Sequence, residues 1–495
     1  MSNILLPIVG VIVTVMLLLI TILRLVIFLH MLQLEGYKTA RFIKWLINNP
    51  NKILAVRTIK NPKKKLVFTA RTMRLSILTL ILLILVVYNL SKLSLLIFIS
   101  MIFLTAFFAP ILLVLSNILI HPLETAINNL YLRSAKKRIK TLKPKVIAIT
   151  GSYGKTSTKD ILAHILSSKY KVLKTPGSFN TPMGLCKVIR GELKPEHEVF
   201  IVELGARKKG EIKELCELVK PEIGIITAIG HQHLEMFKTL ENIMDTKYEL
   251  IESLPANGIA VFNNDDENCK RLANRTVDKK VLRYGINDNN EKLYLAAKDI
   301  FTSSQGVSFS AQNSKGGAIF YRSKLLGRHN VYNILAAATV ALELGISLNK
   351  IAEIIQNLEP SPHRLQLIRG AGGVTVIDDA FNANPVGAKT ALDVLNEFKG
   401  GKKILVTPGL VELGMREYDE NKQLGIAAAK VCDFVFLIGP KRTKPIFEGL
   451  KESGFAETNI FIEKSLKDAT EKFKNVLKFG DVVLFENDLP DTYNE

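Results

Sequence analysis

Apolar residues are concentrated in the first 120 positions of the chain, where they form three long runs. Ile4–Leu23 is a run of twenty residues without a charge, and a helix of about that length crosses the hydrocarbon core of a bilayer. Two further runs, Leu75–Leu90 and Leu93–Ile120, are parted only by a Ser-Lys pair. This pattern predicts a membrane region over residues 1–120 with about three transmembrane helices. The last two runs could instead form one re-entrant hairpin.

A basic loop separates the first run from the second. Eleven Lys and Arg residues lie in residues 33–74, and positively charged loops remain in the cytoplasm. Three spans with the N-terminus outside would place this loop and everything after Ile120 inside the cell. The first run lacks a basic start and a cleavage site, so we expect a retained anchor in the cell membrane. The loop could be merely solvated, or it could contact anionic lipid headgroups of the bilayer.

The pattern of hydrophobic positions changes after a polar linker at residues 121–143, which we expect to be a surface helix. From Pro144 onward, short buried strands alternate with helical stretches, which is typical of an α/β protein with a largely parallel sheet. Val281–Tyr321 has shorter strands with Gly, Asn and Ser turns, so we expect an antiparallel subregion there. Pro360 and Pro362 mark a boundary. We therefore predict two α/β domains, at residues 144–360 and 361–495.

The individual elements follow from the same alternation. The expected strands are Val199–Glu203, Ile223–Ile229, Gly258–Asn263, Val374–Asp378, Lys403–Thr407, Phe434–Ile438 and Val482–Phe485. The expected helices include Thr156–Ser168, Gly210–Val219, Leu240–Ser253, Asn330–Leu344 and Ile351–Leu358.

Composition narrows the choice of partners and compartment. The 495-residue chain has 48% hydrophobic residues, a mean hydropathy of +0.20 and a net charge of +20. Such a charge suits nucleic acid, an anionic membrane face or phosphorylated substrates, and the basic loop between apolar runs favours the membrane over nucleic acid. The four cysteines are far apart and form no C-x-x-C pair. They indicate a reducing compartment without a structural zinc or disulfide framework.

Residues 146–158 predict a phosphate-binding loop, because a buried strand runs into a glycine turn and then a helix. Glycines in such a turn let the backbone N–H groups and the helix N-terminus approach an anion. Lys155 would contact the β- and γ-phosphates of ATP, and the Thr156 hydroxyl would coordinate Mg²⁺. The common G-x-x-x-x-G-K-[ST] pattern would have glycine where Ile149 stands, so an ordinary glycine turn is the alternative. The expected nucleotide-binding residues here are Gly151, Ser152, Gly154, Lys155, Thr156 and Ser157.

Five segments, taken in order, resemble the motifs of the Mur ligase family. They are Thr150–Ser157, Glu203–Arg207, His233–Glu235, Gly327–Asn333 and Asp378–Pro385. Within this family the segments are most similar to those of the enzymes that add D-alanyl-D-alanine, and the resemblance extends from about Lys145 to the end of the chain. It implies a central P-loop ATPase domain followed by a C-terminal Rossmann-like domain. It also implies a reaction that joins an amine to a carboxylate, with ATP and Mg²⁺, through an acyl phosphate.

The resemblance also implies roles for residues of the central domain. Thr156 and Glu203 would hold Mg²⁺, and Glu203 stands at the end of an expected strand, where a doubly wound sheet presents its site. His233 would take part in a second metal position, although a lone histidine usually packs or caps a helix and His231 lies two residues away. Lys247 falls where the family has a lysine that reacts with CO₂ to form a carbamate bridging metals, yet it could simply be one lysine on a charged helix. The implied catalytic residues are Lys155, His233 and Lys247.

Further implied contacts reach the nucleotide from other segments. Asn330 and Asn333 resemble the family's adenine-side residues, although each could be only a helix cap or a polar helix position. Arg364 would reach the ATP phosphates across the domain junction, and Asp379 would bind the ribose. Two domains that share one nucleotide imply closure before chemistry, which would exclude water from the acyl phosphate.

The resemblance predicts D-alanyl-D-alanine addition to a UDP-MurNAc-tripeptide-like acceptor in peptidoglycan precursor synthesis. One departure stands out, because membrane runs occupy the place of the small uridine-binding domain of the soluble relatives. The acceptor could therefore be held by the remaining domains, or it could be a lipid-linked wall precursor. A membrane-bound poly-γ-glutamate synthase and a P-loop ATPase without ligase activity are the alternatives; Asp379–Pro385 and Val406–Gly414 favour the wall ligase over the former. A transporter fits less well, since few polar residues could line a path through the apolar runs.

Overall fold

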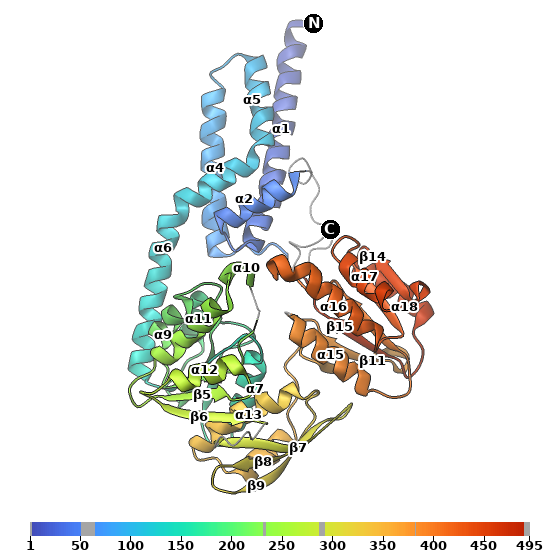
Figure 1. Ribbon diagram of the computed structural model, residues 1–495. Coiled ribbons are helices and arrows are strands. Elements are labelled where there is room, and N and C mark those ends of the chain that lie inside the picture. The colour runs from blue at the N-terminus through green and yellow to red at the C-terminus, as the bar shows by residue number, and fades with distance from the viewer. Residues whose placement is uncertain (1, 51–64, 231–233, 287–292, 382, 490–495) are drawn as a thin grey trace. The chain divides into compact units, whose positions relative to one another are not determined.

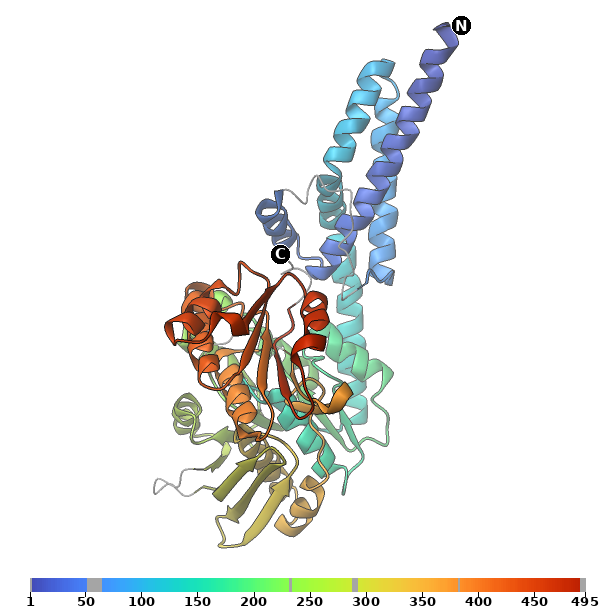
Figure 2. The same ribbon diagram turned by 90° about the vertical axis from the view of Figure 1, so that its right-hand side faces the viewer.

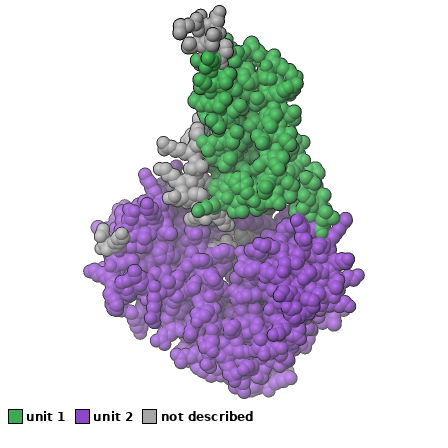
Figure 3. All heavy atoms as spheres, turned by 180° about the vertical axis from the view of Figure 1, so that it is seen from behind, with its two compact units in different colours: residues 1–130, 489–494 green, residues 131–488, 495 purple. Residues whose placement is uncertain are grey.

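The structure is a computed structural model that describes residues 2–50, 65–230, 234–286, 293–381 and 383–489. The chain divides into two compact units (Figure 3). The first comprises most of residues 1–130, and the second comprises residues 131–488.

The first unit is helical (Figure 1). Its elements are α1 (Ser2–Leu34), α2 (Thr39–Asn48), α4 (Ala70–Leu90), α5 (Leu95–Phe107) and the first part of α6 (Ala109–Leu142). Three segments, Ile8–Leu34, Ala70–Leu90 and Ala109–Leu142, are long and apolar enough to cross a membrane. The prediction of about three such helices is thereby confirmed for their length and composition.

The run Leu93–Ile120, in which Pro110 is a candidate kink, forms two helices. The chain breaks at Phe108, so that α5 has 13 residues and a new helix begins at Ala109. Pro110 explains the break, because proline fits the first turn of a helix but clashes with a preceding turn. Residues 121–142, where we expect a surface helix, belong to this new helix. Helix α6 continues without interruption from its apolar half to Leu142, with Pro122 inside it.

Polar side chains join the helices of the first unit. Arg74 donates two hydrogen bonds to Glu124, of 2.7 and 2.9 Å, and the Glu124 side chain is buried. Tyr37 and Thr72 share a hydrogen bond of 2.6 Å between their hydroxyls. Phe42 of α2 is fully buried and packs edge-on against Phe28 of α1, with ring centroids 6.4 Å apart. Phe42 thus holds α2 against α1, while the hydrogen bonds join α4 to α6 and to the segment before α2.

The second unit begins with a nine-stranded sheet in the order β2-β3-β1-β4-β5-β6-β7-β8-β9. The strands β1 to β6 pair in parallel, and β7, β8 and β9 continue the sheet as an antiparallel meander. The antiparallel subregion predicted for Val281–Tyr321 is therefore confirmed from β7 onward, whereas residues 281–285 belong to the parallel strand β6. The strands are β1 (Lys145–Thr150), β2 (Val172–Lys174), β3 (Val199–Glu203), β4 (Ile223–Ile226), β5 (Ile259–Asn263), β6 (Lys280–Gly285), β7 (Leu295–Ser303), β8 (Gly306–Asn313) and β9 (Ala318–Ser323).

Helices cover both faces of this sheet (Figures 1 and 2). The central strand β1 sends Ile147 and Ile149 into one core and Val146 and Ala148 into the other, as the twofold alternation of a strand requires. The first core includes α7 (Lys155–Leu166), α13 (His329–Glu343) and α14 (Leu348–Ile355). The second includes α8 (Pro182–Gly191), α9 (Glu211–Val219), α11 (Leu240–Glu252) and α12 (Glu267–Arg275), and the short α10 (Leu234–Phe237) precedes α11.

A six-stranded sheet follows, in the order β10-β11-β15-β12-β13-β14, with only β10 antiparallel to its neighbour. Three helices cover one face and α18 covers the other (Figure 1). The strands are β10 (Gln366–Arg369), β11 (Thr375–Asp379), β12 (Lys403–Thr407), β13 (Phe434–Ile438), β14 (Ile460–Glu463) and β15 (Val482–Glu486). The helices are α15 (Pro385–Glu397), α16 (Glu417–Ala429), α17 (Lys444–Glu452) and α18 (Leu466–Val476).

Candidate active site

The glycine turn between β1 and α7 can be built only with glycine. Gly154 has a φ of 77°, and a Cβ on it would lie 2.5 Å from Asn333 Oδ1. Gly151 has a φ of 150°, and a Cβ there would lie 2.0 Å from Thr227 Oγ1. The turn therefore brings the backbone close to its neighbours and opens the N-terminus of α7, which is the geometry that binds a phosphate. The residues present fit an ATP phosphate chain.

Lys155, the first residue of α7, lies over the turn. Its Nζ donates to the carbonyl oxygens of Gly151 and Ser152 at 2.7 and 3.2 Å. Burial lowers the pKa of Lys155 to about 8, an effect that Glu203 opposes and Arg364 reinforces. The ammonium is therefore held where an incoming phosphate oxygen would replace neutral carbonyl partners by a charged one.

Glu203, at the end of β3, gathers three partners. It accepts hydrogen bonds from Thr156 Oγ1 at 2.8 Å and from Asn180 Nδ2 at 3.1 Å. The Lys159 Nζ lies 3.4 Å from the same carboxylate, and both side chains are buried. Thr156 and Glu203 thus meet, and a hydroxyl beside a carboxylate is an oxygen pair that suits Mg²⁺. The pair fits the Mg²⁺ that the loop predicts.

The sequence pattern did not predict the roles of Lys159 and Asn180. Lys159 stands four residues after Lys155, so both project from one side of α7, and this spacing was the available signal. Its Nζ also donates to the Gly177 carbonyl oxygen, which ties the helix to the loop that carries Asn180. No local pattern distinguishes Asn180 from an ordinary loop residue, because its partner Glu203 is 23 positions away.

Lys247 is buried on α11, with 4% of its surface exposed. Burial, helped by the positive charge of Lys155, lowers its pKa well below the ordinary value, while Cys269 acts in the opposite direction. The charged helix face that we considered as an alternative is therefore not its environment. A neutral amine is the form that reacts with CO₂, so the carbamate role remains a prediction that this environment suits.

The second metal position is not defined by the described part of the chain. His233 and His231 lie outside the described residues. Within the ranges that the structure describes, no group of three or more His, Cys, Asp or Glu side chains is arranged to hold a metal. Thr156 and Glu203 are therefore the predicted ligands that the structure brings together.

The two asparagines of α13 take part in hydrogen bonds that connect this helix to α7, the helix that follows the phosphate loop. Asn333 accepts a hydrogen bond of 3.3 Å from Thr158 Oγ1 and donates one of 2.9 Å to Asn330 Oδ1. Asn330 in turn donates to the Leu326 carbonyl oxygen at 2.7 Å, and both amides are buried. This chain of hydrogen bonds positions α13 against α7, and the adenine contact stays a prediction.

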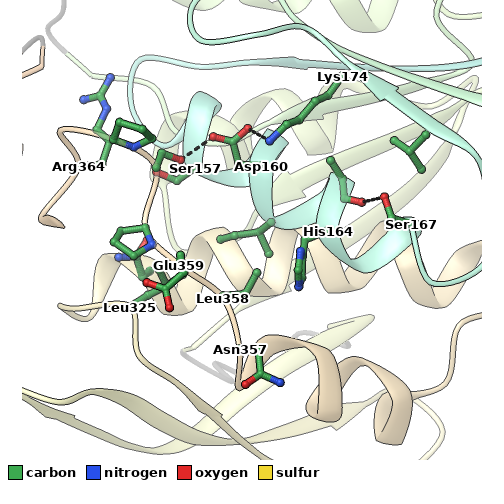
Figure 4. Close-up of a pocket in the computed structure, with 17 residues that line it drawn as sticks. Ser157, Asp160, His164, Ser167, Lys174, Leu325, Asn357, Leu358, Glu359 and Arg364 are labelled. Carbon is green, nitrogen blue, oxygen red and sulfur yellow. Dashed lines mark hydrogen bonds and ion pairs between the residues drawn. The ribbon is translucent and has the colours of Figure 1, made fainter. Parts of the chain in front are cut away.

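A pocket of about 450 Å³ lies along α7 (Figure 4). Three of the predicted nucleotide residues, Ser157, Asn330 and Arg364, line it. Asp160 holds one wall in place, because it accepts a 2.6 Å hydrogen bond from Ser361 and pairs with Lys174 at 2.7 Å. The pocket is therefore shaped by α7, the start of α13 and the segment that precedes β10.

Arg364 and Asp379 lie close together at the start of the second sheet. The Arg364 guanidinium donates to the Phe381 carbonyl oxygen at 2.6 Å and covers the Phe381 ring at 4.8 Å. Asp379 accepts a hydrogen bond of 3.2 Å from the Leu365 backbone N–H. Burial raises the pKa of Asp379 to about 6, although Arg364 opposes this shift. Asn382 of the same loop lies outside the described residues.

The comparisons with known proteins assign the family. The profile of the Mur ligase middle domain matches residues 149–341, and the profile described as Mur ligase, glutamate ligase domain matches residues 363–486. The UDP-N-acetylmuramoyl-tripeptide–D-alanyl-D-alanine ligase of Bacillus subtilis (strain 168) is 32% identical over 356 residues, covering 71% of this chain and 75% of the relative. The chain belongs to the Mur ligase family. This Mur ligase is thus an ATP-dependent enzyme that uses Mg²⁺.

Other relatives agree with this assignment. The ligase of the same name from Escherichia coli (strain K12) is 34% identical over 296 residues, and this alignment spans 60% of this Mur ligase and 64% of the relative. Among solved structures, MurF from Acinetobacter baumannii superimposes with a TM-score of 0.66 at 27% identity over 74% of this chain and 78% of that one. MurF from Thermotoga maritima in complex with ADP gives a TM-score of 0.65 at 26% identity, over 74% and 81%.

Proposed function

We propose that this Mur ligase joins D-alanyl-D-alanine to a UDP-MurNAc-tripeptide-like acceptor, at the cost of ATP, in peptidoglycan precursor synthesis. The observation that carries the proposal is the cluster of Lys155, Thr156 and Glu203 at the N-terminus of α7, in a chain whose relatives carry that enzyme's name. A phosphate loop alone would fit any ATPase. The second domain, with Arg364 and Asp379, favours a ligase over a simple ATPase.

The chemistry requires a carboxylate to become an electrophile. Transfer of the γ-phosphoryl group onto it creates an acyl phosphate with a good leaving group, and the amine then attacks. In this proposal Lys155 and Arg364 neutralise the moving charge. Thr156 and Glu203 would hold Mg²⁺, which would stabilise charge on the phosphates, and Lys159 and Asn180 orient Glu203 through the contacts described above. Lys247, as a carbamate, and His233 would be the further metal ligands.

The nucleoside part of ATP would lie between the two α/β domains. Asn330 borders the pocket along α7 on the adenine side, and Asp379 binds the ribose hydroxyls. Arg364 is suited to the phosphates because it lines the pocket along α7. The negative charges of Asp379 and Glu203 also favour its charged form. This arrangement requires domains 144–360 and 361–495 to act on one nucleotide.

The apolar helices lead to a second part of the proposal, which concerns location. We place the enzyme in the cell membrane with several spans, and with its α/β domains in the cytoplasm, where ATP is available. This placement is supported by three helices of sufficient length and by the basic loop at residues 33–74. Cysteine substitutions can test it, because the four native cysteines are buried. Ser91→Cys should react with an impermeant maleimide on intact cells, and Lys44→Cys only after permeabilisation. The reverse result would invert the topology.

The test of function is ADP release by the detergent-solubilised full chain. UDP-MurNAc-tripeptide and D-alanyl-D-alanine are supplied together, and each is omitted in turn. We expect release only with both substrates, its loss in Lys155→Ala, and its retention in the control Lys315→Ala, which changes an exposed lysine in the turn after β8. Release that ignores both substrates would favour the ATPase. Silence with these substrates but activity with glutamate or a lipid-linked precursor would favour the other acceptors.

A further inference from the structure

Glu486 is a buried carboxyl group that none of the roles above employs. It is the last residue of β15 and is fully buried, with 0% of its surface exposed. In the parallel pairing of β11 and β15 it stands directly beside Asp379. No donor from the described residues reaches either of its carboxyl oxygens. An ionised carboxylate without donors is costly in such a position, since it has lost its hydration without replacement.

Few charges face this carboxyl group. Asp379, from β11, and Arg364, from the segment before β10, are the charged neighbours that act on it. On the other side, β12 carries the uncharged Thr407 near this level. Asp378 adds a further negative charge beside Asp379, and it is itself paired with His363 at 2.7 Å. Glu203 is a further negative charge near Arg364.

The charges balance in only one protonation state of the pair. If Asp379 and Glu486 were both ionised, two adjacent negative charges would face one guanidinium that already donates to the Phe381 carbonyl oxygen. If one of the two carboxyl groups keeps a proton, the single negative charge of the other balances the positive charge of Arg364. The protonated group can then donate a hydrogen bond to the ionised one. Glu486 is the more buried of the two, and burial together with Asp379 raises its pKa well above the ordinary value.

We propose that Glu486 is a positioning residue that stays protonated in the working enzyme and donates its proton as a hydrogen bond to Asp379, which keeps Asp379 ionised and oriented toward the ribose of ATP. The proposal rests on the ribose role of Asp379 proposed above. Glu486 itself touches no substrate. It acts as a buried acid that donates to Asp379, and Asp379 is the residue that contacts the ribose.

The consequence is a defined dependence of ATP binding on pH. Protonation of Asp379 removes the acceptor for the ribose hydroxyls, so ATP affinity falls as the pH drops through the pKa of Asp379, about 6. A hydrogen bond from Glu486 to the ionised form of Asp379 lowers that pKa. Without this donor, the loss of affinity begins at a higher pH.

Two variants separate this role from a merely structural one. Glu486→Gln keeps a donor of similar size, and Glu486→Met keeps the volume but has no donor. The measurement is the dissociation constant of ATP for the full chain in detergent, by calorimetry without acceptor or amine, between about pH 5 and pH 8. The melting temperature of each variant shows whether it is folded.

We expect the wild type and Glu486→Gln to lose affinity over the same acidic range. In Glu486→Met the midpoint should move up by about one pH unit, the size of shift expected for loss of a hydrogen bond to a carboxylate. The infrared carbonyl band of a protonated carboxylic acid should also be present in the wild type at pH 7.5 and reduced in Glu486→Gln.

Other outcomes would overturn the inference. If both variants follow the wild type, Glu486 does not act on Asp379. If Glu486→Gln instead shifts the midpoint to lower pH, Glu486 is ionised and repels Asp379. If the wild type binds no ATP at any pH, the proposed function itself fails and takes the inference with it.

Discussion

The Thr156 hydroxyl donates a hydrogen bond of 2.8 Å to the Glu203 carboxylate and so joins the first turn of α7 to the end of β3. The two residues are 47 positions apart in the chain. The parallel pairing of β1 with β3 places Ile149 beside Glu203, so both strands end at the same edge of the sheet. This edge is where a doubly wound fold presents its ligands, and the metal-binding oxygens are therefore assembled by strand register.

Removal of either metal ligand should reduce catalysis. We expect Thr156→Ala and Glu203→Gln to lower kcat by about 10² to 10³, because each removes charge stabilisation near the transferred phosphoryl group. The Mg²⁺ concentration needed for half-maximal activity should rise in both. The control Thr390→Ala changes an exposed hydroxyl on α15. Unchanged Mg²⁺ dependence in both variants would exclude this pair as the metal site.

The buried ion pair of Lys159 with Glu203 should make Lys159 essential for stability. Lys159→Met leaves the Glu203 carboxylate buried without its cation, and breaking such a pair typically costs about 3–5 kcal/mol of unfolding free energy. Denaturant unfolding followed by far-ultraviolet circular dichroism measures this loss of unfolding free energy. Lys171→Met, at an exposed position near β2, should change the stability by less than about 0.5 kcal/mol. Equal stability of the two variants would mean that Glu203 finds other partners.

ATP affinity should also weaken in alkaline solution. The pKa of Lys155 in the free enzyme is lowered to about 8, so its ammonium is lost as the pH rises past that value. Bound phosphate needs the charged form, and the dissociation constant should therefore rise up to about tenfold per pH unit above pH 8. Calorimetry at pH 8.5 should detect proton uptake on ATP binding. Lys155→Arg keeps its charge, and its alkaline limb should be absent.

Lys247 offers a test of the carbamate role. We expect Lys247→Ala to lose activity by about 10² or more, since the bridging carboxylate would be gone. Added acetate or formate should restore part of it, because a free carboxylate can enter the cavity left by the side chain. Lys213→Ala, at an exposed position on α9, should behave as wild type with or without these acids. A fully active Lys247→Ala enzyme would rule out the carbamate.

Much of the α/β architecture was predictable because its strands are short apolar runs with clear limits. The strands at Val199–Glu203, Lys403–Thr407 and Phe434–Ile438 have the bounds that the pattern predicts. The helical unit was less predictable. Pro110 marks where the apolar run breaks, but apolar character alone cannot show that α6 continues without interruption from its apolar half to Leu142, because helix ends depend on backbone hydrogen bonds that composition does not report.

By itself the sequence determined the phosphate loop, the alternation of strands and helices, the apolar helices and the family. All of these are written in contiguous residues, where periodicity, glycine positions and motif order carry the information. Only the tertiary structure decided that Lys159 and Asn180 support Glu203, and that Glu486 lies beside Asp379. The partners in these pairs are far apart in the chain: Asn180 and Lys159 lie 23 and 44 positions before Glu203, and Asp379 and Glu486 belong to different strands. Their energetics arise from burial and strand register, which no local pattern encodes.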